Sequence, residues 1–302
     1  MKNISVLLFL LITLALNAQN NKTSGLNARQ FHKYWKVESE SPDYKVTFLG
    51  DTVEILSPKG LTLWRKEKMS GKVTIEYDAC VVVEVEGDRL SDLNCFWMAS
   101  DPQYPDNIWK REKWRSGIFL NCYSLQLYYM GYGGNHNSTT RFRRYDGNEA
   151  AITNAKARPA ILKEYTDADH LLEANKWYHI KITNENNRVS YYINGVRLVD
   201  FRDADPLTEG WFGFRTTLSR TRIANFHYEC SPQEISEIPL HWIGDTPQQD
   251  RTVSLGVPFS EGELYPENTL QLITDRGETF PIDTWVLAYW PDGSVKWNGI
   301  AG

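Results

Sequence analysis

The sequence is poor in the residues that build small metal or disulfide scaffolds. It has only four cysteines, Cys80, Cys95, Cys122 and Cys230, and none of them forms the Cys-x-x-Cys pair typical of zinc sites. Their spacing fits no small disulfide scaffold, and each lies in an apolar or strand-like run. We therefore expect buried thiols, with one disulfide as the alternative.

Excess positive charge and long apolar runs are also missing. The 33 Lys and Arg residues are outnumbered by 38 Asp and Glu residues, and the net charge of −5 argues against a general nucleic-acid binder. No run is as long as the roughly 20 apolar residues that a membrane-spanning helix needs. We expect neither a nucleic-acid partner nor a membrane span.

The longest apolar run lies at the N-terminus, in "MKNISVLLFLLITLALNAQ". A lysine precedes the run from Val6 to Leu16, and the small residue Ala18 ends it, which is the layout of a secretory signal peptide. A buried N-terminal helix is the alternative, but the polar "QNNKTSG" that follows argues against it. We expect residues 1–18 to be a signal peptide and the protein to be secreted or periplasmic.

Strand signals dominate the rest of the chain. In "KVTIEYDACVVVEVE", every second residue from Val73 to Val85 is apolar, which predicts a strand with one buried face. Gly50-Asp51 and Asn194-Gly195 lie between alternating runs and predict hairpins, the second with a type I′ turn. This pattern predicts an all-β sandwich or jelly roll over residues 24–230. Residues 231–250 then form a linker, and residues 251–302 form a short, separate β segment.

The closing half of the large domain resembles a known fold. "HLLEANKWYHIKI", "RVSYYINGVRLVDF" and "GWFGFRTTLSRTRIANFHY" together resemble the end of concanavalin-like jelly-roll domains. "DLNCFWMASDP" and "GYGGNHNSTTRFRRYDG" are similar to blocks of a secreted bacterial jelly-roll family associated with polysaccharide lyases. The resemblance implies a jelly roll that handles glycans.

The C-terminal segment resembles a different family. "VSLGVPFSEGEL" and "WVLAYWPDGSVKW" resemble the opening of the N-terminal β domain of exo-acting rhamnogalacturonan lyases. In that family the catalytic module lies further downstream, so the resemblance implies a pectin- or uronate-degrading context and supplies no catalytic residue here. We expect residues 251–302 to be the beginning of a longer domain.

Positive charge is concentrated in one region. Between Trp109 and Tyr145 there are seven Lys or Arg residues and one acid, Glu112. If "TTRFRRY" is a strand, Arg141, Arg143 and Tyr145 share one face. Neighbouring arginines on one face favour an anion between them, and the guanidinium fork suits a carboxylate. An ion-pair network with strand acids such as Glu76 is the alternative.

These residues suggest a β-elimination mechanism on an acidic sugar. Arg141 and Arg143 would neutralise the uronate carboxylate, His136 would remove the adjacent proton, and Tyr145 or Tyr128 would protonate the leaving oxygen. A solvated turn histidine is the alternative for His136. The candidate substrate-binding residues are Asn94, Trp97, Asn121, Tyr128, Asn135, Asn137 and Arg215. A position in the core is an equal alternative for Trp97.

The assignments of Asn121 and Arg215 as substrate-binding residues depend on where these residues lie on their strands. Asn121 is expected on a strand, in "GIFLNCYSL". Arg215 shares a face with Trp211 if Phe212 and Phe214 point to the core. We expect no metal site and no cofactor, although "TDADH" at residues 166–170 is a weak calcium candidate.

The sequence therefore predicts a carbohydrate-active protein for acidic, uronate-containing polysaccharide or oligosaccharide, with a polysaccharide lyase favoured. A non-catalytic carbohydrate-binding module is the first alternative. A glycoside hydrolase using Glu76 and Asp78 is the second. Convergence of His136, Arg141, Arg143 and a tyrosine hydroxyl would favour the enzyme, and separation of these groups would favour the module.

Overall fold

The computed structural model describes residues 24–231, 240, 254–261, 263–266, 270–273 and 279–302. These residues form two β units, one ending at Ser231 and one beginning at Ser254. The expected signal peptide and nearly all of the expected linker lie outside the described residues.

The first unit is built almost entirely from strands joined by short helices. Its strands are β1 (Trp35–Ser39), β2 (Lys45–Leu49), β3 (Thr52–Arg65), β4 (Met69–Ser70), β5 (Lys72–Val82), β6 (Leu93–Ser100), β7 (Gln126–Gly133), β8 (Thr139–Asp146), β9 (Lys163–Tyr165), β10 (Trp177–Glu185), β11 (Arg188–Ile193), β12 (Val196–Arg202) and β13 (Glu209–Ser231). Its helices are α1 (Phe31–Tyr34), η1 (Ile108–Arg111), α2 (Glu112–Arg115), η2 (Leu120–Ser124), α3 (Gly134–Asn137), α4 (Ala150–Thr153), η3 (Ala155–Ala157) and η4 (Ala168–His170).

The second unit is small. Strands β14 (Ser254–Pro258), β18 (Val295–Ala301) and β17 (Asp283–Tyr289) form one sheet in that order, and β15 (Leu272–Ile273) pairs with β16 (Thr279–Phe280). Val257, Leu264, Val295 and Ile300 form a small core of their own. The fold is thus all-β, as predicted, with a short C-terminal β segment.

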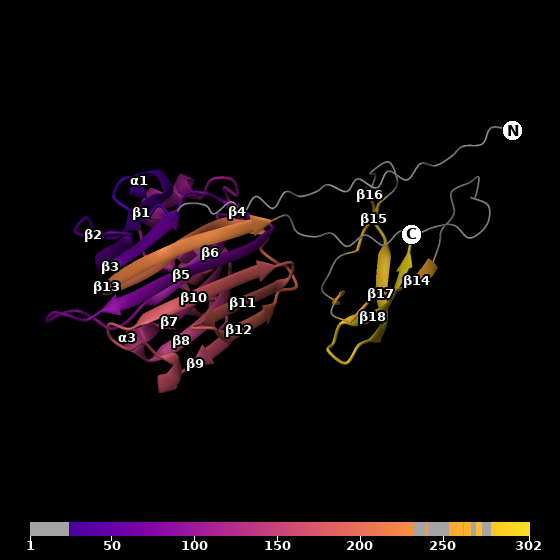
Figure 1. Cartoon of the computed structure of the whole chain (residues 1–302). Coiled ribbons are helices and arrows are strands. Elements are labelled where there is room, and N and C mark those ends of the chain that lie inside the picture. The colour runs from indigo at the N-terminus through magenta and orange to yellow at the C-terminus, as the bar shows by residue number, and fades with distance from the viewer. Residues whose placement is uncertain (1–23, 232–239, 241–253, 262, 267–269, 274–278) are drawn as a thin grey trace.

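Two long strands join the layers of the large unit. The first half of β13 pairs with β6, and its second half pairs with β5, while β3 pairs with it along both halves. One layer therefore continues through β6, β7, β8 and β9, and the other through β5, β10, β11 and β12. Figure 1 shows β13 crossing the front of the molecule beside β5.

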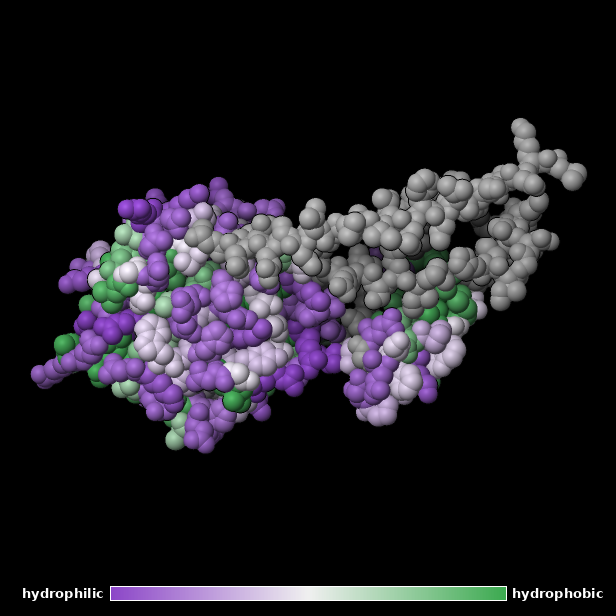
Figure 2. Space-filling model, viewed as in Figure 1, coloured by the Kyte–Doolittle hydropathy of each residue, from purple (hydrophilic) through white to green (hydrophobic). Residues whose placement is uncertain are grey.

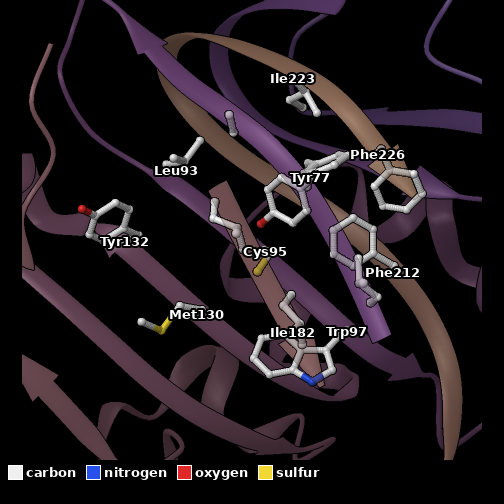
Figure 3. Packing of buried hydrophobic residues seen from close by; sticks show 14 of the residues in the cluster. Tyr77, Leu93, Cys95, Trp97, Met130, Tyr132, Ile182, Phe212, Ile223 and Phe226 are labelled. Atoms are coloured by element: carbon white, nitrogen blue, oxygen red, sulfur yellow. The ribbon is translucent and has the colours of Figure 1, made fainter. Parts of the chain in front are cut away.

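The main core lies between the two layers. On β5, Val73, Ile75, Tyr77, Ala79 and Val81 are all buried, which confirms the predicted alternation over that part of the strand. The prediction is wrong beyond it, because β5 ends at Val82 and Val85 is 56% exposed. Figure 3 shows Tyr77 with Cys95, Trp97 and Phe212 among the side chains of this core.

The predicted type I′ hairpin is present between β11 and β12. Asn194 and Gly195 have φ angles of 50° and 82°, the positive values that both central positions of this turn require. Ile193 pairs directly with Val196 across the turn.

A second apolar cluster covers the opposite face of the β6–β7–β8 layer. The segment from Asp101 to Leu125, with η1, α2 and η2, lies on this face, and α4 adds to it. The buried residues of this second cluster are Trp64, Phe96, Ala99, Ile108, Cys122, Tyr123, Leu125, Leu127, Tyr129, Tyr145, Ala151 and Trp211. Both faces of these strands are therefore largely covered.

A buried ion pair holds this covering segment in place. Arg115 Nη2 donates to Glu38 Oε2 on β1 at 2.9 Å and to the Ile108 carbonyl at 2.8 Å. The Arg115 side chain is 0% exposed and that of Glu38 is 4% exposed. Arg111 forms a bidentate ion pair with buried Asp101, in which Nε donates to Oδ2 at 2.7 Å and Nη2 donates to Oδ1 at 2.8 Å.

All four cysteines are thiols. Cys80, Cys95 and Cys122 are buried, and burial raises the pKa of Cys95 to about 12 and that of Cys122 to about 11. The expectation of burial is wrong for Cys230, which is exposed near the end of β13.

We predict that Glu38→Gln lowers the free energy of unfolding by about 3 kcal/mol, because it leaves the buried Arg115 charge without its main partner. Urea unfolding followed by tryptophan fluorescence measures this loss. Asp200→Asn is the control, since Asp200 forms an exposed pair with Arg188 and such pairs contribute at most about 1 kcal/mol. Equal losses in the two variants would contradict the assigned role of the buried pair.

Candidate functional site

The strand register gathers several predicted site residues on one face of the sheet. Thr62, Arg215, Asn94, Gly131 and Arg141 are successive partners across β3, β13, β6, β7 and β8. A parallel row contains Trp64, Gly213, Phe96, Tyr129 and Arg143. We call these two rows together the arginine face. They lie on the side of the layer opposite the main core.

The backbone of Tyr129 lies in the row of Arg143, but its side chain extends into the row of Arg141 and ends at Gly131. A methyl group at residue 131 would overlap the Tyr129 hydroxyl, so the glycine leaves the space that this hydroxyl fills. Gly131 lies between Asn94 and Arg141 in the register. The ring is held by Phe96, Phe119 and Tyr145, with ring centroids 5.5 to 5.7 Å away.

The charges around Tyr129 oppose one another. Burial raises the pKa of the Tyr129 hydroxyl above its ordinary value, and the negative charge of Asp92 raises it further. The positive charges of Arg215 and Arg143 act in the opposite direction. The result is a neutral phenol, able to donate a hydrogen bond, in a positively charged setting.

The three arginines of β8, Arg141, Arg143 and Arg144, differ in their partners. Arg141 forms an ion pair with Glu164 on β9. Arg144 points to the other side of the strand and pairs with Asp203 at 2.6 Å and with Asp205 at 3.1 Å. Arg143 Nη1 donates to the Pro159 carbonyl at 2.6 Å, and no carboxylate of the described residues pairs with it.

Arg215 shares its face with Trp211, as predicted, while Phe212 and Phe214 point into the main core. It is only 2% exposed. Its Nη1 donates to the Gly117 carbonyl at 2.6 Å and to Thr62 Oγ1 at 3.3 Å. Arg215 therefore binds the segment from Asp101 to Leu125 that covers the sheet, and its buried positive charge acts on the Tyr129 hydroxyl.

Asn94 is also close to buried, with 6% of its surface exposed. Its Nδ2 donates to Asp92 Oδ1 at 3.2 Å. Its Oδ1 accepts no hydrogen bond from the residues that the structure describes. A buried acceptor without a donor is costly.

Two expected substrate contacts belong to the main core instead. Trp97 is 0% exposed and packs against Tyr128, Phe142 and Tyr191, and Figure 3 shows it among the core side chains. Tyr128 is also 0% exposed, and its hydroxyl donates to Asp203 Oδ2 at 2.6 Å. Neither side chain presents a surface to a ligand, which corrects those two assignments.

Tyr145, expected as a catalytic acid, lies on the arginine side of β8 but beneath the covering segment. It is 0% exposed, and its hydroxyl has no hydrogen-bond partner among the described residues. Burial raises its pKa well above the ordinary value. The second apolar cluster therefore separates this hydroxyl from solvent.

The loop after β7 is a tight left-handed turn. Asn135, His136 and Asn137 have φ angles of 52°, 60° and 57°, and the His136 side chain is exposed. Asn135 Nδ2 donates to Ser138 Oγ at 3.1 Å. The Asn137 side chain both donates to and accepts from the backbone of Leu172, so it ties the turn to the segment before β10.

Asn121 does not lie on a strand, contrary to the prediction. It lies in η2, and its Nδ2 donates to the Trp114 carbonyl at 3.1 Å. The apolar residues around it cover the sheet rather than extend it.

Glu76 and Asp78 lie on the outer face of the other layer. Glu76 pairs with Lys181 at 2.7 Å, and this hydrogen bond lowers the pKa of the carboxyl. Asp78 accepts from His179 Nδ1 at 2.8 Å. These acids form an ion network away from the arginine face.

No group of three or more potential metal ligands gathers within the described residues. In "TDADH", Asp167 contacts His170 through a short helical turn. No helix of the described chain is long and apolar enough to cross a membrane.

Tyr129 is the site residue that sequence reasoning left out. A pattern in the sequence could have indicated it, because Tyr129 and Gly131 are two residues apart and so share one face of β7, where they pair with Arg143 and Arg141. Recognising it required the register of the β7–β8 hairpin, which places Tyr129 opposite Arg143.

Comparison with protein families identifies both parts of the chain. A family model described as "Domain of unknown function (DUF6250)" matches residues 55–226, more than half of the 302 residues. The chain belongs to the DUF6250 family. A second model, the "PcRGLX-like N-terminal RIFT barrel domain", matches residues 236–302, in agreement with the resemblance seen in the C-terminal segment.

One solved structure supports the fold of the DUF6250 domain. A Bacillus subtilis protein of unknown function with a galectin-like fold superimposes with a TM-score of 0.53 at 15% identity, covering 67% of this chain and 91% of that one. The carbohydrate binding module CBM66 from Bacillus subtilis gives a TM-score of 0.43 at 18% identity, covering 65% of this chain and 94% of the module.

One curated relative is the uncharacterized protein YetA of Bacillus subtilis (strain 168). It is 36% identical over 59 residues, which are 20% of this chain. This chain spans only 7% of the length of YetA.

We predict that Gly131→Ala destabilises the protein by about 1–3 kcal/mol, because the new methyl group displaces the packed Tyr129 ring. Gly134→Ala is the matched control, since a methyl group there would lie 3.8 Å from the nearest atom. Urea unfolding of both variants measures the difference. An unchanged stability in Gly131→Ala would show that the Tyr129 hydroxyl does not fill this space.

Proposed function

We propose that the DUF6250 domain is a carbohydrate-binding module whose arginine face binds an acidic, uronate-containing saccharide. The observation that carries this proposal is the register that sets Arg215, Asn94, the Tyr129 hydroxyl and Arg141 across adjacent strands, with Arg143 beside them. Cations, an unsatisfied acceptor and a donor lie together on one side of the sheet.

Each group suits part of a sugar acid. Arg143, half-buried and bonded to a carbonyl, can offer its remaining N–H groups to a carboxylate. The Oδ1 of Asn94 can accept from a sugar hydroxyl, and the neutral Tyr129 hydroxyl can donate to a ring or carboxylate oxygen. A neutral sugar would leave Arg143 without a counter-charge.

The geometry supports a binding module better than an enzyme. His136, the expected base, lies exposed in the turn after β7, and no hydrogen bond among the described residues links it to Tyr129 or to an arginine. Tyr145, the expected acid, is enclosed. A proton-transfer mechanism needs both groups within reach of one sugar.

The second domain suggests the context. The match to a PcRGLX-like RIFT barrel domain supports our proposal that the module accompanies a lyase acting on pectin or rhamnogalacturonan. The galectin-like neighbour supports a sandwich fold on which such a site can be built. The N-terminal apolar run supports a secreted or periplasmic location, which we also propose.

We predict that Arg143→Gln weakens binding of oligogalacturonate by about ten- to a hundredfold, because it removes a charge-assisted hydrogen bond to the carboxylate. Isothermal titration calorimetry with the full chain measures this affinity. Arg197→Gln is the control, since Arg197 is an exposed strand arginine on β12, outside the arginine face.

Three results would contradict this assignment. One is wild-type affinity in Arg143→Gln, another is equal binding of a neutral oligosaccharide, and the third is binding that does not weaken with added salt.

β-Elimination at the same face is the second candidate function. Tyr129 favours it, because its hydroxyl, which lies at Gly131 between Asn94 and Arg141, could donate its proton to the leaving oxygen as the C4–O bond breaks and the C4–C5 double bond forms, while a solvent water molecule takes the C5 proton. If so, Tyr129→Phe abolishes the formation of unsaturated product, followed by ultraviolet absorbance, while affinity falls by about tenfold at most through the loss of one hydrogen bond. No product from the wild-type chain, together with clear binding, leaves the module as the function.

A further inference from the structure

A hollow opens at the edge of the sheet formed by β1 and β2, several strands away from Arg143. Its volume is about 570 Å³, within the range of roughly 300–1,000 Å³ typical of ligand pockets. Strands β7, β6, β13 and β3 separate this edge from Arg143 on β8. The hollow is therefore a separate place on the domain.

Aromatic and aliphatic side chains line most of the hollow. Tyr44, just before β2, and Phe48 of β2 pack against the main core on one side and are half-buried, so they also face the opening. Trp109 of η1 contributes a further ring. Figure 2 shows hydrophobic residues at the surface at the end of the molecule where Figure 1 places β2.

The polar side chains of the lining have a common character. His32, Lys36 and Lys66 contribute nitrogen groups, and none of the described residues that line the hollow carries a carboxylate or amide side chain. The lining therefore offers mainly donors and positive charge, with the Tyr44 hydroxyl and the His32 ring as its side-chain acceptors. In a chain of net charge −5, this arrangement favours an anion.

The two lysines differ in how far their charge is already balanced. Lys36 forms an ion pair with Glu112 and lies 5.2 Å from the centroid of the Trp109 ring. Lys66 is exposed, and its Nζ donates a hydrogen bond to the His32 carbonyl. Lys66 thus has no carboxylate partner among the described residues, and its charge is available to a ligand.

We propose that this hollow binds a ring compound that carries a carboxylate, with its apolar face on the aromatic lining and its carboxylate at Lys66. Rings pack well on aromatic side chains, and an ammonium group forms a strong hydrogen bond to a carboxylate. A sugar acid is the source we favour, and that choice alone rests on the proposed function. The site itself would then be a second point of attachment for the same polysaccharide.

Ligand-observed NMR titrations of the full chain test this proposal. The probes are galacturonate, the neutral sugar galactose, and benzoate as an aromatic acid. We expect galacturonate to bind, galactose to bind at least about tenfold more weakly, and Lys66→Gln to weaken galacturonate binding by about tenfold. Lys45→Gln is the matched control, because Lys45 lies on β2 beside Tyr44 but is not part of the lining.

The outcomes separate this proposal from the proposed function. An effect of Lys66→Gln with no effect of Arg143→Gln supports the second site and contradicts the arginine face. Benzoate binding that depends on Lys66, without galacturonate binding, supports recognition of a carboxylated ring and assigns an aromatic acid as its source. Binding of neither acid, or equal affinity in Lys66→Gln and wild type, overturns the proposal.

Discussion

Strand β13 is the element on which both layers depend. It exchanges backbone hydrogen bonds with β3, with β5 in its second half and with β6 in its first half. Its alternation sends Phe212 and Phe214 into the main core and Trp211 and Arg215 to the opposite side. Because β6, β7 and β8 follow in register from β13, the position of Arg215 also determines where Asn94 and Arg141 lie.

Much of the fold could be predicted from the sequence because the physical signals are local. The alternation of Val73, Ile75 and Tyr77 appears as a buried face, and Asn194-Gly195 forms the expected turn. The common face of Arg141 and Arg143 also follows from a period of two. These features depend only on residues that are neighbours in the chain.

The site was harder to predict where both faces of a strand are buried. All but the last residue of β6 are buried, because the main core covers one face and the segment from Asp101 to Leu125 covers the other. Because apolar residues then occur on both faces of the strand, their alternation does not show which face packs in the main core. Trp97 was therefore assigned to the wrong face. Asn121 was misplaced for a related reason, since the apolar residues beside it pack downward onto the sheet from a short helix. The position of Tyr129 opposite Arg143 required the pairing of two strands, which one strand alone does not reveal.

The buried thiols have a chemical consequence. The thiolate form of cysteine, rather than the thiol, reacts with oxidants and with disulfides. A raised pKa keeps the thiolate fraction of a cysteine very small near neutral pH. Burial gives Cys95 and Cys122 such pKa values and also shields their sulfur atoms from reagents. The interior of this domain can therefore stay reduced in an oxidising environment, without any crosslink between its strands.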